Sequence, residues 1–278
     1  MTILRYGQRL SILVSVKGHT FDRSAFGALF DEMPGIAAAI VDQPASARLM
    51  TPAGMAGFDA VVLYDMPGID FLARGGPAFV DPSPTEKAGF LAMLDAGIPV
   101  VALHHAIAGW QTWPEYAEIL GGRFLYRPAT LRGRECPDSG YLPDAEYTAR
   151  AAGPGHPILA GLPQQIPFKD TLFLYEVFEG DVNPLLRADH SFGDEGFFST
   201  KEALAGRMYS NADWAHPPGS DLIGWTKRAR NAPLVYLQPG RGVETCANPH
   251  YRQLVRNAIL WACASEQRAL STSRKVRT

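Results

Sequence analysis

Two adjacent histidines, His104 and His105, follow an apolar run in the segment VVALHHAIAGW at residues 100–110. A neutral imidazole accepts a proton near pH 7 and its cation donates one, so a histidine in a cleft can act as a general base or acid. Neighbouring residues of an extended chain point in different directions. We therefore expect one of the two to face a cleft and the other to anchor the loop. The alternative is that both only pack within the core or the loop.

Three more residues with versatile side chains also follow apolar runs. His19 comes directly after Gly18, which permits a tight turn, Asp65 ends the run FDAVVLYD, and Arg241 lies between two glycines. A carboxylate can orient a histidine, and a guanidinium can grip a carboxylate or phosphate with two parallel hydrogen bonds. A turn, capping or purely structural role is the alternative for each of the three.

Two tryptophans are candidates for a surface on which a sugar could stack. Trp110 closes the histidine segment, and Trp214 lies in a stretch rich in proline and glycine. The large, partly polar rings of tryptophan suit a surface that is apolar on one side and wet on the other. Packing in the core is the alternative interpretation.

Several known kinds of site are absent from the sequence. It contains no G-x-S-x-G elbow, no G-x-x-x-x-G-K-[ST] loop, no G-x-G-x-x-G after the first apolar run and no H-E-x-x-H. We therefore expect no nucleotide cofactor. Adjacent histidines are poorly spaced to chelate one metal, so a divalent ion would need His19 or a carboxylate as well. We assign no residue as a metal ligand, and the metal requirement stays open.

The elements that must position these residues alternate between strands and helices in the first half of the chain. Buried strands are predicted at 10–16, 36–42, 58–65 and 98–105, and helices at 22–33, 83–97 and 113–122. Such alternation is typical of an α/β fold with a parallel sheet covered on both faces. Ligands of open α/β sheets bind beyond the carboxyl ends of the strands. That rule brings His19, Asp65, the histidine pair and Arg241 to one edge of the molecule.

The second half of the chain is less regular. We predict strands at 168–178, 183–189, 222–228 and 232–238, and a helix at 249–263. Residues 129–156 are rich in Arg, Asp, Gly and Pro, which indicates a surface excursion. We expect one domain over residues 1–265, followed by a polar tail at 266–278.

Composition limits the partners and the compartment. The chain has 278 residues and a net charge of −2, and no basic run precedes the tail, so we expect no nucleic-acid partner. No apolar stretch approaches the roughly 20 residues needed to span a bilayer. Three cysteines without C-x-x-C spacing fit neither a disulfide framework nor a zinc site. We expect a cytoplasmic protein that binds a small molecule, with a homo-oligomer left open.

Six segments resemble the ThuA-like (trehalose utilisation) family in order and spacing. They are residues 14–22, 58–65, 98–124, 156–178, 221–242 and 248–262. The resemblance implies a flavodoxin-like three-layer sandwich with a mostly parallel sheet, related to class I glutamine amidotransferases. Those relatives carry a nucleophilic cysteine in the turn after a central strand. Here the turn reads LHHAIAG and has no cysteine, which argues against a thiolate mechanism.

The chain departs from this family pattern at two places. The family often has Asp-Glu-Leu-Tyr where this chain has residues 170–173, Asp-Thr-Leu-Phe, and Gly-His where it has Gly240-Arg241. Replacing an imidazole by a permanent cation removes a proton shuttle and adds a group that binds anions. If the site of the family uses that histidine, the resemblance implies that activity here is either lost or redirected, with an acidic substrate as one direction.

We hypothesise an enzyme that acts on a small sugar-derived or carbonyl-bearing molecule. His104 or His105 would be the general base or acid, assisted by His19, in a hydrolysis, elimination or enolisation. The substrate would be bound or oriented by polar and aromatic side chains, for which the candidates are Arg241, Asp65, Asp170, Trp110 and Trp214. A non-catalytic small-molecule-binding module and a metal-dependent hydrolase are the alternatives.

Overall fold

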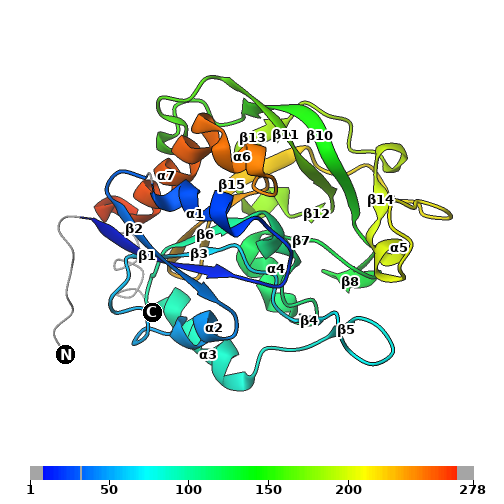
Figure 1. Cartoon of the computed structure of the whole chain (residues 1–278), viewed down its shortest axis with the longest axis horizontal. Helices are drawn as coiled ribbons and strands as arrows, with labels where there is room; N and C mark the ends of the chain where they lie inside the picture. Colours follow the sequence, from blue (N-terminus) through cyan, green and yellow to red (C-terminus); the bar gives the residue numbers. More distant parts are fainter. Residues whose placement is uncertain (1–8, 32, 268–278) are drawn as a thin grey trace.

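A ten-stranded mixed sheet runs through the centre of the computed structural model, which describes residues 9–31 and 33–267 (Figure 1). Its strands are β1 (Leu10–Val16), β2 (Ile36–Asp42), β3 (Ala60–Leu63), β6 (Val100–Leu103), β10 (Gly140–Ala151), β11 (Gln165–Leu174), β13 (Asn183–Ala188), β14 (Phe198–Ser199), β15 (Leu222–Ala229) and β16 (Ala232–Leu237). The order is β11-β10-β13-β15-β16-β6-β3-β1-β2, with β14 paired to β10.

Half of this sheet is parallel, as the alternating pattern predicts. β1 pairs in parallel with β2 and β3, and β6 pairs in parallel with β3 and β16. Side chains alternate between the two faces, so Ile12 and Val14 enter one apolar core and Leu13 enters the other. The predicted α/β class is confirmed, with the parallel pairing of β1, β2, β3 and β6 that the pattern indicates.

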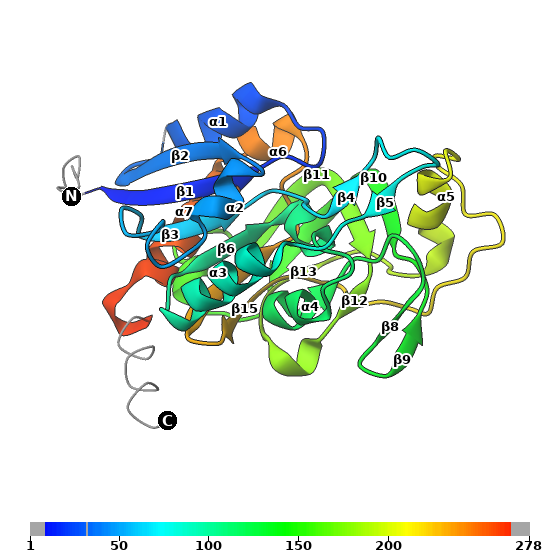
Figure 2. The same ribbon diagram turned by 90° about the horizontal axis from the view of Figure 1, so that it is seen from below.

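Helices cover both faces of the sheet and complete three layers. They are α1 (Arg23–Asp31), α2 (Ala45–Leu49), α3 (Pro84–Asp95), α4 (Pro114–Leu120), α5 (Thr200–Leu204), α6 (Val243–Ala247) and α7 (Pro249–Cys263). Figures 1 and 2 show α1, α6 and α7 on one face and α2, α3 and α4 on the other. The α3 helix begins where the sequence predicts, because Ser83 and Glu86 form a capping box around Pro84.

The other half of the sheet is antiparallel and contains residues that we predicted to lie in a surface excursion. β10 pairs antiparallel with β11 and β13, and β13 pairs antiparallel with β15. Along β10 the side chains of Ala145, Tyr147 and Ala149 are buried in alternation with polar residues. The excursion over 129–156 is therefore wrong for residues 140–151. Its many polar residues lie on one face of a strand whose small apolar residues pack inward.

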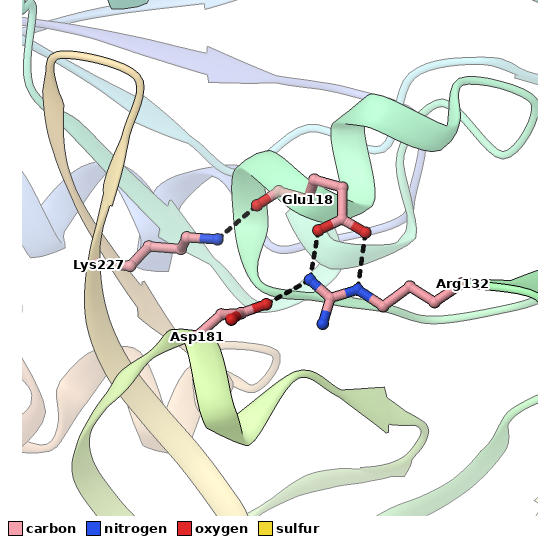
Figure 3. Close-up of polar contacts among 4 residues, drawn as sticks. All are labelled: Glu118, Arg132, Asp181 and Lys227. Atoms are coloured by element: carbon pink, nitrogen blue, oxygen red, sulfur yellow. Dashed lines mark hydrogen bonds and ion pairs between the residues drawn. The ribbon is translucent and has the colours of Figure 1, made fainter.

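Three two-stranded sheets lie outside the main sheet. They pair β4 (Ile69–Asp70) with β5 (Ala78–Phe79), β7 (Gly122–Arg123) with β12 (Glu176–Val177), and β8 (Ala129–Leu131) with β9 (Arg134–Cys136). In the β8–β9 turn, Arg132 bonds to Glu118 of α4 and to Asp181 of the 3₁₀ helix η3 (Glu179–Asp181) (Figure 3). Lys227 donates to the backbone carbonyl of Glu118. Arg132 thus attaches the hairpin to α4 and η3, and Lys227 attaches α4 to β15.

Two further observations concern the ends of the chain and its helices. The predicted tail at 266–278 lies outside the described residues from 268 onward. Among the helices of residues 9–31 and 33–267, none combines the length and the apolar character that crossing a bilayer requires.

Candidate active site

The predicted strand at 98–105 ends two residues early, and this change of conformation separates the two histidines. β6 stops at Leu103, and His104 opens the 3₁₀ helix η1 (His104–Ala108) with a left-handed φ of 46°. The Nδ1 of His104 lies 2.6 Å from the carbonyl oxygen of Gln238. A carbonyl only accepts, so Nδ1 carries the proton of a neutral ring. Burial lowers the pKa of His104 well below its usual 6.5. His104 is thereby fixed within the interior.

His105 instead lines a cavity of about 270 Å³ beyond the carboxyl ends of the strands. Its side chain is 9% exposed, and its Nδ1 is buried without a hydrogen-bond partner. Nε2 is therefore the ring nitrogen that a molecule in the cavity can reach. Burial lowers the pKa of His105 well below 6.5, and the positive charge of Arg241 adds to this effect. At neutral pH the ring is a proton acceptor.

His19 lies against His105 and is fixed by the backbone around it. The two rings are nearly parallel, with centroids 4.1 Å apart and an interplanar angle of 17°. The Nε2 of His19 lies 2.7 Å from the carbonyl oxygen of Tyr64 and can donate to it. Burial lowers the pKa of His19, whereas this carbonyl opposes the change. The turn requires Gly18, because a Cβ there would come within 2.1 Å of the Met66 carbonyl oxygen.

Arg241 reaches the same cavity from a turn that a buried carboxylate supports. Asp170 accepts hydrogen bonds from the backbone N–H groups of Gly240 at 2.6 Å and Arg241 at 3.2 Å. The Tyr64 hydroxyl donates to the Gly240 carbonyl oxygen at 2.8 Å. The Arg241 side chain is exposed and lines the cavity. Burial raises the pKa of Asp170, while these N–H groups favour its charged form.

The structure therefore brings His19, His104, His105 and Arg241 together and places Asp170 behind them. Asp170 holds the turn that carries Arg241, since its carboxylate is directed to the backbone and does not line the cavity. This arrangement agrees with the expectation that one histidine of the pair faces a cleft and the other anchors the loop.

Three other predicted binding residues lie away from this cavity. Asp65 accepts hydrogen bonds from Ser15 and Gln43 and lines a separate small recess together with Trp110. The preceding residue, Tyr64, instead packs in the apolar core and bonds to Gly240, although both residues directly follow β3. The indole of Trp214 donates to the Asp138 carbonyl oxygen at 3.1 Å and does not line the cavity.

Most of the remaining cavity wall consists of residues that the sequence reasoning missed. Thr171 and Phe173 come from β11. The other aromatic wall residues are Phe71, Phe124, Tyr126, Tyr141 and Tyr209. For Thr171 and Phe173 a signal existed, because residues two apart on a strand share a face. Phe71 and Tyr209 lie in loops, where no periodicity marks them.

The described part of the chain provides no evident metal centre. Nowhere in residues 9–31 and 33–267 do three His, Cys, Asp or Glu side chains converge as metal ligands. Cys136, Cys246 and Cys263 are buried, and none of the three forms a disulfide within the described residues. The metal-dependent alternative thus has no ligand set in this part of the molecule.

Comparison with solved structures identifies proteins of the same fold. A ThuA-like protein from Parabacteroides merdae aligns with a TM-score of 0.63 and 16% identity, covering 92% of this chain and 90% of the other. One from Bacteroides uniformis gives 0.58 and 15%, covering 94% and 95%. A cytoplasmic protein of Salmonella typhimurium LT2 gives 0.56 and 12%, covering 91% and 99%.

Sequence comparison gives the family. No curated protein matches the sequence. The profile of the ThuA family, described as trehalose utilisation, matches residues 17–262. This match begins directly after β1 and covers the other strands of the sheet and all the residues that line the cavity. The chain belongs to the ThuA family.

Proposed function

We propose that the protein is an enzyme that moves a proton on a small carbonyl-bearing molecule, with His105 as general base. The observation that supports this most directly is that His105 lines an open cavity beside Arg241. Its lowered pKa keeps the imidazole unprotonated at neutral pH, as a base requires. The stacked ring of His19 limits the orientations that His105 can adopt.

The chemistry begins with a carbon next to a carbonyl group. Nε2 of His105 takes the proton, and the electron pair of the broken C–H bond forms an enolate. The Arg241 cation stabilises negative charge in the cavity. If the carbon also carries a hydroxyl group, the intermediate is an enediolate. An isomerisation is complete when the hydroxyl proton moves to the former carbonyl oxygen and His105 returns its proton to the former carbonyl carbon. In an elimination, the bond to a leaving group on the neighbouring carbon breaks as the carbonyl re-forms, and the leaving group departs with the proton held on Nε2.

The family description suggests substrates to test, and the shared fold suggests a non-catalytic alternative. The family description makes sugar-derived carbonyl compounds one group to test. A non-catalytic binding module would use the same cavity without proton transfer, since a shared fold does not fix function. Proton exchange at carbon distinguishes the enzyme from the binding module, whereas ligand binding does not, because both would bind.

Hydrogen–deuterium exchange at carbon tests this proposal. The full chain is incubated in D₂O with keto-sugars and 2-oxo acids, and loss of the C–H signal is followed by NMR. We expect enzyme-dependent exchange with at least one compound and a decrease of about 10²- to 10⁴-fold in His105→Asn. His250→Asn, a partly exposed histidine outside the cavity, is the control. Equal exchange in His105→Asn and the wild type would remove the base from the mechanism.

A further inference from the structure

The cavity beside His105 contains one formal charge. Among the described residues that line it, Arg241 is the only one with a permanently charged side chain, and no carboxylate is present. Within the described residues the guanidinium forms no ion pair with an acid. Burial lowers the pKa of both His19 and His105, and the charge of Arg241 adds to this effect. An unpaired guanidinium in a pocket favours an anionic ligand group.

The wall around this charge is apolar and aromatic. Phe124 and Phe173 form its inner part, with ring centroids 4.8 Å apart. The rim includes Phe71, Met208 and Tyr209, which are 44%, 53% and 62% exposed. Large apolar side chains gathered at the mouth of a pocket indicate a binding surface.

The rim comes from two loops that are far apart in the sequence. Phe71 lies in the β4–β5 connection, and the other two residues follow α5. The Tyr209 backbone N–H donates to the Tyr141 hydroxyl at 2.9 Å, which attaches the second loop to β10. Figure 2 shows β4, β5 and α5 at the same end of the molecule.

This lining does not suit a ligand rich in hydroxyl groups. Hydroxyls against phenyl rings would lose hydrogen bonds to water without replacement. The wall carries hydroxyl groups on Thr171, Thr200, Tyr126, Tyr141 and Tyr209 but neither a carboxylate nor a side-chain amide. The hydroxyls of Tyr126, Tyr141 and Thr200 already form hydrogen bonds within the protein, so few polar groups are left for a ligand with many hydroxyls. The volume of about 270 Å³ is also below the usual range of about 300–1,000 Å³ for ligand pockets. The dimensions and the lining favour a small molecule with one apolar group.

We propose that the cavity binds a small amphipathic anion, in which a carboxylate pairs with Arg241 and an apolar body packs against Phe124, Phe173 and the rim. This names the substrate class for the site of the proposed function and depends on it only for the role of His105. A 2-oxo acid with an apolar side chain carries the anion, the apolar body and the carbonyl group that the proposed function requires.

Calorimetric titration of the full chain with four probes tests this class. Phenylpyruvate carries both the ring and the carboxylate, pyruvate lacks the ring, phenylacetone lacks the carboxylate, and glucose lacks both. We expect phenylpyruvate to bind at least about tenfold more tightly than either truncated probe. Tighter binding of glucose, or no binding of phenylpyruvate at millimolar concentration, would overturn the proposal.

Variants of Arg241 test the anion contact directly. Arg241→Gln should weaken phenylpyruvate binding by about 10- to 100-fold and leave phenylacetone binding unchanged. Arg241→Lys keeps the charge but not the two-pronged contact, and should fall between wild type and the Gln variant. Arg150→Gln, at an exposed ion pair with Asp189 outside the cavity, is the matched control. Equal loss for both probes in Arg241→Gln would contradict a specific anion contact.

One more variant separates this inference from the proposed function. His105→Asn should retain phenylpyruvate binding while losing C–H exchange. If wild type shows the expected probe ranking and no exchange with any compound, the ligand class stands and the catalytic proposal fails. If exchange occurs only with keto-sugars and phenylpyruvate does not bind, the ligand class fails and the catalytic proposal stands.

Discussion

The imidazole of His19 covers one face of the imidazole of His105, with ring centroids 4.1 Å apart. His19 is itself held by the Tyr64 carbonyl oxygen, and Tyr64 also holds the Gly240 carbonyl next to Arg241. Tyr64, which directly follows β3, therefore holds both His19, which packs against the proposed base His105, and the turn that carries Arg241. We therefore expect His19 to act as a positioning residue for His105.

Removing the ring of His19 should slow exchange without removing the base. We expect His19→Ala to lower kcat by about 10²-fold with little change in KM, because His105 gains rotational freedom. His19→Phe keeps an aromatic ring at the same place and should retain most of the rate. Exchange rates measured across substrate concentrations give both constants. Equal losses in the Ala and Phe variants would instead indicate that His19 transfers a proton.

The Asp170 carboxylate should matter for the turn that carries Arg241. Asp170→Asn replaces one acceptor oxygen by an amide N–H that faces backbone N–H groups. We expect a loss of about 1–3 kcal/mol in the free energy of unfolding and weaker anion binding. Urea denaturation and phenylpyruvate titration measure the two effects. Unchanged values for both would show that the hydrogen bonds from Gly240 and Arg241 do not support the turn.

The buried histidines should make the protein sensitive to mild acid. The pKa values of His19, His104 and His105 are lowered from 6.5 in the folded state by burial. Below about pH 6.5 the unfolded chain therefore binds more protons than the folded chain, and stability falls as the pH falls. Above that pH these groups contribute no pH dependence.

Urea denaturation between pH 8 and pH 5 checks this sign. The free energy of unfolding should decrease from about pH 6.5 downward, and the slope should be smaller in His105→Asn than in the wild type. His250→Asn again serves as the control. Parallel pH curves for the wild type and His105→Asn would show that His105 does not contribute.

Substitutions in the Asp65 recess should leave the cavity unaffected. Asp65 contacts Ser15 and Gln43, and neither it nor Trp110 lines the cavity of His105. We expect Asp65→Asn to change stability but to leave the affinity for phenylpyruvate and the exchange rate unchanged. The same two assays check this. A loss of affinity with retained folding would place Asp65 in the substrate site after all.

The sequence predicts the parallel half of the fold well and the antiparallel half less well. The ranges of β1, β2 and α7 coincide with the predicted 10–16, 36–42 and 249–263, because their apolar periodicity is local and strong. β10 was missed because its buried residues are mostly small and alternate with charged ones, which resembles a surface loop. Its pairing with β11 and β13 is non-local and cannot be read from a short segment.

The candidate site was accessible from the sequence only in part. The rule that ligands bind at the carboxyl ends of strands correctly groups His19, the histidine pair and Arg241. It does not specify on which side of the sheet each residue lies, so Asp65 was grouped with them although it points into another recess. The rim loops carry no periodic signal, so Phe71 and Tyr209 emerge only from the folded chain.

The wall of the cavity has two origins within the sheet. The proton-accepting side comes from the turn after β6, in the parallel half, whereas Thr171, Phe173 and the segment after α5 come from the antiparallel half and its loops. Under the proposed function, the base and the residues that select the ligand therefore lie on separate stretches of chain. Insertions or exchanges within residues 200–209 should alter which molecule enters while the imidazole keeps its surroundings, so specificity can evolve independently of the proton-transfer step.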